Sequence, residues 1–261
     1  MRMVVKIGGA ALDSAELLER CARALADVAR EGHEVAVVHG GGAALTRMLA
    51  QLGKQSQFVD GLRVTDAETR DVALMVLAGG VNKKLVAALA RAGQPALGLC
   101  GGDGMSFRVA KRKANGHDLG YVGDVCSTDM RWLHAIWANG GVPVISSLGL
   151  GPQGEYYNVN ADQMAAACAV ACQAHALVFL TDVPGVRGVD GSVMRWLDTQ
   201  QIPALVNSST VQGGMLPKLE ACRMALTRGV GRVRILPASD VEFLPEFYHA
   251  KLEAGTEVTV P

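Results

Sequence analysis

Short runs of consecutive apolar residues alternate along this chain with longer segments in which apolar residues recur every three or four positions. The short runs are typical of strands buried on both faces, and the longer segments are typical of amphipathic helices. This alternation predicts an α/β protein in which right-handed crossovers build a parallel sheet covered by helices on both faces. The expected strands are residues 3–7, 35–38, 96–99, 143–147, 176–181 and 232–236, and the expected helices are residues 14–30, 43–52, 66–92, 129–139, 161–173 and 215–228.

Three regions depart from the alternation. Residues 107–125 are polar and contain Asn115-Gly116, a dipeptide that favours tight turns, so we expect a β-hairpin lying over the sheet. Residues 153–158 predict a second, shorter hairpin, and residues 255–260 predict a final strand at an edge of the sheet.

The overall composition excludes several classes of partner. The 261 residues include 25 basic and 25 acidic side chains, so the net charge is zero and we expect neither a nucleic acid nor an acidic membrane surface as partner. The first strand begins by residue 3, which leaves no room for a leader peptide, and we expect no apolar run that spans a bilayer. These features predict a cytoplasmic protein.

Six cysteines are spread along the chain without a C-x-x-C pair, which favours reduced, buried thiols. Cys168, Cys172 and His175 can share one helix face, as metal ligands do. Because no fourth ligand is nearby, we interpret them instead as small residues of an Ala-rich core helix and expect no protein metal cluster.

The first strand ends in features that suit a phosphate. Lys6 lies inside an apolar strand, where a charge is costly unless an anion answers it. Gly8 and Gly9 follow, where backbone amides can approach a ligand closely, and a helix capped by Asp13 or Ser14 comes next. This stretch predicts one half of a phosphate site.

A second glycine turn follows the next strand. His39-Gly40-Gly41-Gly42 offers more glycines than a tight turn needs, so its amides are available to an anion or a carbonyl. The same motif occurs in the oxyanion hole of esterases, but the G-x-S-x-G turn that carries their nucleophile is absent from this chain.

A second lysine begins a helix late in the chain. Lys218 follows Gly213, Gly214 and Pro217, and a cation in a first helical turn opposes the helix dipole. A bound anion would remove that objection, so Lys218 is our second candidate for binding phosphate.

Two asparagines and an aspartate precede the Ala-rich helix. Asn160 suits the N-cap, with Asp162 and Gln163 in the first turn, and capping alone accounts for much of this pattern. Asn158 and Asn160 alternate in a strand end, however, so both amides face one side, where they can hold a carboxylate or an amide.

Two more charged residues stand next to secondary-structure ends. Arg63 precedes a long helix, where an arginine is usually on the surface but can also clamp a carboxylate with two hydrogen bonds. Asp182 follows a strand, where α/β sheets bind ligands, although Asp-x-Pro-Gly is equally typical of a plain turn.

Taken together, these residues suit phosphoryl transfer, which requires positioning and charge neutralisation more than covalent help. A carboxylate acceptor would need no general base, because it is already ionised near pH 7. The motifs resemble, in the same order, those of the acetylglutamate kinases, members of the amino acid kinase family. They are Val5-Lys6-Ile7-Gly8-Gly9, His39-Gly40-Gly41-Gly42, Gly61-Leu62-Arg63-Val64-Thr65, Asn158-Val159-Asn160-Ala161-Asp162-Gln163, Leu180-Thr181-Asp182-Val183-Pro184-Gly185 and Gly213-Gly214-Met215-Leu216-Pro217-Lys218.

The resemblance implies transfer of the ATP γ-phosphate to the side-chain carboxylate of N-acetyl-L-glutamate, in arginine biosynthesis. It also implies a three-layer αβα sandwich around a mainly parallel sheet of about eight strands, with β-hairpins over the substrate site. The implied catalytic residues are Lys6, Lys218 and Asp162, the implied substrate-binding residues are Gly41, Gly42, Arg63, Asn158 and Asn160, and the implied nucleotide-binding residues are Gly8, Gly9, Asp182, Val183, Gly185, Val186, Arg187, Thr210, Val211 and Gln212.

The resemblance further implies that Mg²⁺ is held mainly through the ATP phosphates. It implies a lobe of residues 1–174 for the acceptor and for dimerisation, and a lobe of residues 175–261 for the nucleotide. Arginine-inhibited members carry an extra N-terminal helix before the first strand. We therefore expect a homodimer without arginine feedback, built through the helix of residues 66–92 and a neighbouring edge strand.

Two alternatives remain open at this point. One is a sister kinase that acts on carrier-protein-bound aminoadipate or glutamate in lysine biosynthesis. The zero net charge does not suggest the basic surface that would bind an acidic carrier protein. A non-catalytic sensor on the same fold would be expected to lose Lys6, Lys218 or Asp162, and all three are present.

Overall fold

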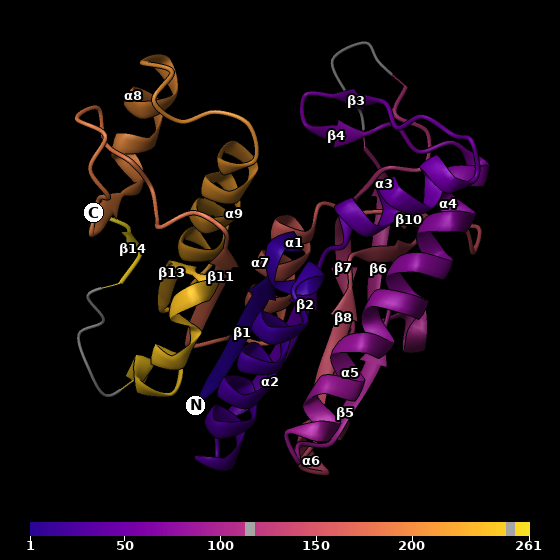
Figure 1. The fold of residues 1–261 in the computed structure, drawn as a ribbon, viewed down its shortest axis with the longest axis horizontal. Coiled ribbons are helices and arrows are strands. Elements are labelled where there is room, and N and C mark those ends of the chain that lie inside the picture. Colours follow the sequence, from indigo (N-terminus) through magenta and orange to yellow (C-terminus); the bar gives the residue numbers. More distant parts are fainter. Residues whose placement is uncertain (113–117, 249–253) are drawn as a thin grey trace.

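A single sheet of eight strands runs through the molecule and helices cover both of its faces (Figure 1). The computed structural model describes residues 1–112, 118–248 and 254–261. The strand order is β12-β14-β13-β11-β1-β2-β8-β5, and the six strands from β13 to β5 are parallel. These strands are β1 (Arg2–Ile7), β2 (Glu34–His39), β5 (Ala96–Leu99), β8 (Val142–Ser146), β11 (Ala176–Thr181), β12 (Trp196–Asp198), β13 (Arg232–Pro237) and β14 (Thr256–Thr259).

The hydrophobic core forms two layers, one on each face of the sheet. Val5 and Ile7 of β1 pack into one layer, and Val4 packs into the other, as the alternation of side chains along a strand requires. Helices α2 (Ala15–Arg30) and α5 (Asn82–Arg91) cover the first face, and helices α6 (Arg131–Ala138), α7 (Ala161–Ala171) and α9 (Met215–Thr227) cover the second. The three-layer αβα sandwich is therefore confirmed.

The predicted helices are all present, with ends within about two residues of those expected. Ser14 is the N-cap of α2, since its hydroxyl accepts a hydrogen bond from the amide of Leu17 at 3.2 Å. The short helix α1 was not expected. The helices are α1 (Gly9–Asp13), α2 (Ala15–Arg30), α3 (Gly42–Gln51), α4 (Ala67–Ala73), α5 (Asn82–Arg91), α6 (Arg131–Ala138), α7 (Ala161–Ala171), α8 (Ile202–Asn207) and α9 (Met215–Thr227), with 3₁₀ turns at Asp103–Met105, Thr199–Gln201, Ala238–Phe243 and Pro245–Tyr248.

Both predicted hairpins are present, although the second spans residues 148–158 rather than the expected 153–158, and they join one small sheet. The order of this sheet is β10-β9-β6-β7, formed by β6 (Phe107–Lys111), β7 (Gly123–Thr128), β9 (Leu148–Leu150) and β10 (Tyr156–Asn158). The predicted Asn115-Gly116 turn lies outside the described residues. A further hairpin of β3 (Phe58–Val59) and β4 (Leu62–Arg63) was not predicted.

The last strand does not lie at an edge, which corrects the expectation for residues 255–260. β14 lies between β13, with which it is antiparallel, and β12, with which it is parallel. The edge position belongs to β12, a strand of three residues too short to give a recognisable pattern.

The long helix predicted for residues 66–92 is continuous but not uniformly α-helical. A π-helix at Leu74–Val81 separates α4 from α5. By length and composition the whole helix, Ala67–Arg91, is apolar enough to cross a membrane, so the expectation that no such segment exists does not hold by that criterion. Half of its most apolar window is nevertheless buried inside the molecule, with Leu85 and Leu89 fully enclosed, as in the core helix of a globular protein.

Candidate active site

Three charged side chains from distant parts of the sequence meet at the end of the sheet where the parallel strands terminate. The ammonium nitrogen of Lys6, on β1, lies 2.8 Å from Asp162 Oδ1. The ammonium nitrogen of Lys218 lies 3.0 Å from both carboxylate oxygens of Asp162. All three side chains are nearly buried, with exposed fractions of 11%, 8% and 7% for Lys6, Asp162 and Lys218. One carboxylate thus holds two ammonium groups together.

Local structure fixes each member of this charged centre. Lys6 belongs to the central strand, which is paired on both sides by β11 and β2. Asp162 lies in the first turn of α7, where the N-cap Asn160 accepts hydrogen bonds from the amides of Asp162 at 2.9 Å and Gln163 at 3.2 Å. Lys218 lies in the first turn of α9, with its ammonium 5.2 Å from the centre of the Phe179 ring.

The centre carries an excess of positive charge in a buried place. Burial raises the pKa of Asp162, but the Lys6 and Lys218 ammonium groups outweigh burial and hold that pKa below its usual value. Burial and repulsion from Lys6 lower the pKa of Lys218, despite the attraction of Asp162. Two cations facing one carboxylate leave one positive charge for an anionic ligand to balance.

A small cavity of about 170 Å³ lies where the second glycine turn, the β3–β4 hairpin and the start of α7 converge. A space of this size suits a small polar acceptor. Its lining includes all five predicted substrate-binding residues, which are Gly41, Gly42, Arg63, Asn158 and Asn160.

Gly41 packs too closely against the π-helix to carry a side chain. Gly41 has a φ of 151°, and a Cβ there would lie 2.6 Å from Leu77 Cδ2 of the π-helix. Gly41 is also the N-cap of α3 and supplies no side-chain acceptor to the amides of the first turn. These amides are therefore suited to an anion.

Arg63 is buried on the cavity wall, with an exposed fraction of 7%. Its guanidinium donates to the Gly42 carbonyl at 3.0 Å, to Thr46 Oγ1 at 2.7 Å and to Ser56 Oγ, and it stacks on the ring of Phe58. Burial lowers its pKa below the usual value. Burial is the only cause that shifts this pKa, and within the described residues no carboxylate pairs with Arg63, so its charge is available to a bound carboxylate.

The two asparagines face the same cavity but differ in their partners. The Asn158 amide donates to Thr65 Oγ1 at 3.4 Å, at the long end of hydrogen-bond distances. The Asn160 side-chain oxygen is engaged in capping α7, which leaves its amide NH₂ for a ligand.

The two residues of the first glycine pair, Gly8 and Gly9, have different surroundings. The Gly8 amide donates to the Leu180 carbonyl at 3.1 Å, and a Cβ on Gly8 would lie 3.0 Å from that oxygen. Gly8 therefore allows β1 to pass close to β11. Gly9 is exposed at the start of α1, next to the charged centre in sequence.

The predicted nucleotide segments contain both exposed and enclosed residues. Asp182 and Val183 are exposed beyond the end of β11, whereas Val186 and Val211 are buried in the core. Gly185 has a φ of 148°, and its neighbour Val186 donates its amide to Thr256 Oγ1 at 2.9 Å. The remaining residues, Arg187, Thr210 and Gln212, make local hydrogen bonds to Gly191, Ser208 and Ser209 respectively.

Sequence reasoning missed the residues that support Arg63. Thr46 lies in a helix interior, Ser56 in a polar loop and Phe58 in the two-residue strand β3, and no spacing links them to Arg63. It also missed the buried contact between His39 and Asn82, which lie 3.1 Å apart between Nε2 and Nδ2. Burial lowers the pKa of His39 to about 4, so this ring is neutral at pH 7.

The Cys168–Cys172–His175 region is structural. Cys172 Sγ donates to the Ala169 carbonyl, and His175 Nδ1 accepts from the Arg2 amide at 3.0 Å. Over residues 1–112, 118–248 and 254–261, no group of three or more His, Cys, Asp or Glu side chains is arranged to hold a metal ion.

The doubly wound fold and the paired lysines are those of a phosphotransferase. A family model described as the amino acid kinase family matches residues 1–237. The chain therefore belongs to the amino acid kinase family.

Two sequence relatives and one solved structure extend this comparison. Acetylglutamate kinase of Acidobacterium capsulatum is 63% identical over 99% of both chains. Acetylglutamate kinase of Koribacter versatilis is 52% identical over 99% of this chain and 98% of its own. N-acetylglutamate synthase of Neisseria gonorrhoeae, complexed with coenzyme A and N-acetyl-glutamate, matches with a TM-score of 0.87 at 26% identity, over 99% of this chain and 59% of that chain.

Proposed function

We propose that this protein transfers the γ-phosphate of ATP to the side-chain carboxylate of N-acetyl-L-glutamate, forming N-acetyl-L-glutamyl 5-phosphate in arginine biosynthesis. The observation that carries the proposal is the meeting of the Lys6 and Lys218 ammonium groups on Asp162. Relatives named acetylglutamate kinase, which align over almost the whole chain, support this acceptor.

The charged centre stabilises the transferring phosphoryl group. Lys6 and Lys218 approach oxygens of that group and balance the negative charge that spreads over them in the transition state. Asp162 holds both ammonium groups in place, so little reorganisation is needed when the phosphate arrives. The acceptor carboxylate is already ionised near pH 7, so no residue has to remove a proton.

The small cavity binds the acceptor. Arg63 binds the α-carboxylate of acetylglutamate, and Asn158 binds its amide with support from Asn160. The amides of Gly41 and Gly42 approach the acceptor or the phosphate from the N-terminus of α3.

Residues of the opposite half of the sheet bind ATP in this proposal. The Asp182–Arg187 turn and the segment Thr210–Gln212 bind the nucleotide in this proposal. Asp182, Val183 and Arg187 are exposed toward it, and the buried Gly185, Val186 and Val211 support these segments from the core. Gly8 and Gly9 lie near the ATP phosphates. Mg²⁺ binds mainly through the ATP phosphates and neutralises their charge. Residues 1–174 then serve as the acceptor lobe and residues 175–261 as the nucleotide lobe of a cytoplasmic enzyme.

Steady-state kinetics with three acceptors tests the proposal. We expect the kcat/KM for N-acetyl-L-glutamate to exceed those for L-glutamate and N-acetyl-aminoadipate by at least about tenfold. L-glutamate lacks the amide that Asn158 would bind and brings a free ammonium into the cavity that Arg63 lines, whereas the extra methylene of N-acetyl-aminoadipate fits a cavity of about 170 Å³ poorly. Equal turnover of acetyl-aminoadipate would contradict the assigned acceptor. Turnover only of a carrier-bound substrate would favour a lysine-biosynthesis kinase, and binding without turnover of any acceptor would favour a sensor.

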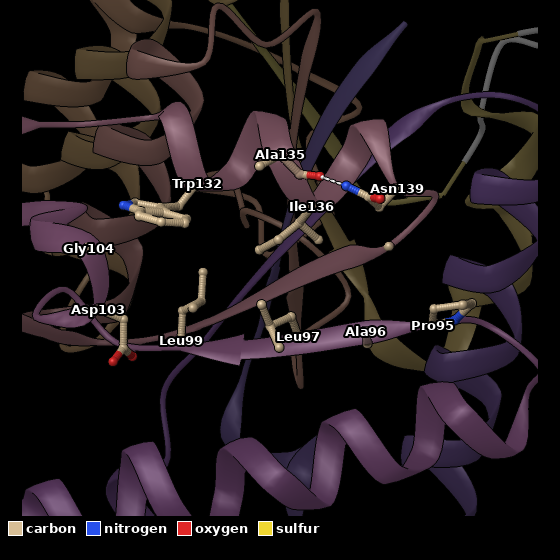
Figure 2. Close-up of a pocket in the computed structure, with 11 residues that line it drawn as sticks. Pro95, Ala96, Leu97, Leu99, Asp103, Gly104, Trp132, Ala135, Ile136 and Asn139 are labelled. Carbon is tan, nitrogen blue, oxygen red and sulfur yellow. Dashed lines mark hydrogen bonds between the residues drawn. The ribbon is translucent and has the colours of Figure 1, made fainter.

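We also propose that the protein is a homodimer, built through the long helix and the neighbouring edge strand β5. Beside β5 lies an apolar groove of about 530 Å³ against α6, into which Leu97, Leu99 and Ile136 project (Figure 2). Leu97 and Trp132 are 53% and 54% exposed, so the groove beside the unpaired strand edge presents large apolar side chains to solvent. A second copy covering this surface would bury them.

Light scattering on the purified protein tests the dimer. We expect twice the chain mass of 27.4 kDa, and we expect Leu97→Asp to give a monomer because it places a charge in the apolar contact. Phe243, a large apolar residue that is 45% exposed at a different place, provides the control: Phe243→Asp should remain dimeric. A monomeric wild-type protein, or a dimeric Leu97→Asp variant, would contradict this interface.

A further inference from the structure

The guanidinium of Arg63 donates hydrogen bonds to three oxygen atoms of the protein. The acceptors are the Gly42 carbonyl at 3.0 Å, Thr46 Oγ1 at 2.7 Å and Ser56 Oγ. A guanidinium has five N–H donors, so these bonds leave donors for a carboxylate in the cavity that Arg63 lines. These three acceptors therefore fix the orientation of the guanidinium and of its remaining N–H donors.

Thr46 differs from the other two acceptors because its hydroxyl makes two connections. It accepts a hydrogen bond from Arg63 and donates one to the Gly42 carbonyl at 2.9 Å. Gly42 begins α3 and lines the cavity, and Arg63 belongs to β4. One hydroxyl thus links the arginine on the hairpin to the glycine turn on the other wall of the cavity.

A threonine hydroxyl that donates to the carbonyl four residues earlier is common in helices and usually has no further role. Thr227 on α9 is an example within this chain, since it donates to the Arg223 carbonyl at 2.8 Å. What distinguishes Thr46 is the bond that it accepts from a buried cation, and hydrogen bonds to charged groups are stronger than those between neutral groups.

We propose that Thr46 is a positioning residue for the acceptor: it holds Arg63 at a fixed place relative to the Gly41–Gly42 turn, and so sets the affinity for the acceptor carboxylate. The inference rests on the proposed function, since it names the residue that orients the arginine of the same site. Thr46 acts through Arg63 and makes no contact with the reacting phosphoryl group.

Three variants test the proposal by steady-state kinetics. Thr46→Val keeps the shape and removes the hydroxyl, and we expect it to raise the KM for N-acetyl-L-glutamate about tenfold, with kcat and the KM for ATP changed less than about twofold. Thr46→Ser retains the hydroxyl and should stay within about twofold of wild type. Thr227→Val loses the matching helix hydrogen bond and should leave all three constants unchanged.

Each other outcome would overturn the inference. A KM for the acceptor within about twofold of wild type in Thr46→Val would show that Arg63 needs no hydroxyl there. A Thr46→Ser variant as impaired as Thr46→Val, or an equal rise in the KM for ATP, would indicate a general disturbance of packing. If Thr46→Val does not fold, Ser56→Ala provides the second measurement, because it removes another hydrogen-bond acceptor of Arg63. It should likewise raise only the KM for the acceptor. An unchanged KM would show that the hydrogen bonds to Arg63 do not set the affinity for the acceptor.

Failure of this inference is distinguishable from failure of the proposed function. A wild-type enzyme that does not phosphorylate N-acetyl-L-glutamate would refute the function itself. An active wild-type enzyme with an unaffected Thr46→Val variant would refute only the role of Thr46.

Discussion

Replacing Lys218 by methionine is expected to lower kcat about a thousandfold while leaving the Kd for ATP within about threefold. The Lys218 ammonium is buried beside Asp162 and Lys6, where it balances charge on the phosphoryl group in transit rather than in the resting nucleotide. Stability should not fall, because burial disfavours the charged form of Lys218 and because Lys6 remains 2.8 Å from Asp162.

Single-turnover kinetics and ATP titration together measure this effect. Lys111→Met is a suitable control, because Lys111 is half exposed and pairs with Asp118 on the surface. Its kcat should match that of wild type. Equal losses of ATP affinity and of kcat in Lys218→Met would mean that Lys218 binds the nucleotide uniformly, against the transition-state role proposed here.

Replacing Asp162 by asparagine is expected to destabilise the fold by about 3 kcal/mol or more, in addition to reducing kcat. The change removes the carboxylate that both buried ammonium groups contact, and it leaves two like charges side by side. The pKa of Asp162 in the folded protein is held below 3.8, so its contribution is present above that value and is lost as the pH falls through the folded pKa. The stability difference should therefore be the same at pH 7 and pH 5.

Urea unfolding of both proteins at the two pH values provides the measurement. Asp27→Asn is the matched control, because Asp27 pairs with Arg30 on the surface and both side chains are 52% exposed. Its loss should stay below about 1 kcal/mol. If Asp162→Asn lost no more stability than Asp27→Asn, the two buried ammonium groups would not need the Asp162 carboxylate to balance their charge, and the prediction would be wrong.

The arrangement of the sheet was predictable wherever a strand is buried on both faces. The strand Ala176–Thr181 is apolar at every position before its last residue, Thr181, so its boundaries follow directly from the sequence. β12 was missed because three residues, the first of them exposed, give no period to recognise, and the position of β14 was then misjudged as an edge. The π-helix at Leu74–Val81 was missed because its residues have the same helical pattern as their neighbours.

Residues of the candidate site were predictable where a charged side chain occupies a position that ordinarily disfavours its charge. Lys6 in an apolar strand and Lys218 in a first helical turn each indicated an anion, and the structure places both on Asp162. Thr46 and Ser56, which accept hydrogen bonds from Arg63, give no such signal, because a threonine in a helix and a serine in a loop are both common. Their importance arises only from the folded path of the chain, which brings Arg63 against them.

A crystal structure with a non-hydrolysable ATP analogue, Mg²⁺ and N-acetyl-L-glutamate tests the central claim most directly. We predict that the Lys6 and Lys218 nitrogens both lie within hydrogen-bond distance of the terminal phosphate oxygens, with the acceptor side-chain carboxylate facing that phosphorus. A terminal phosphate bound away from both nitrogens, with Asp162 still between them, would contradict the account.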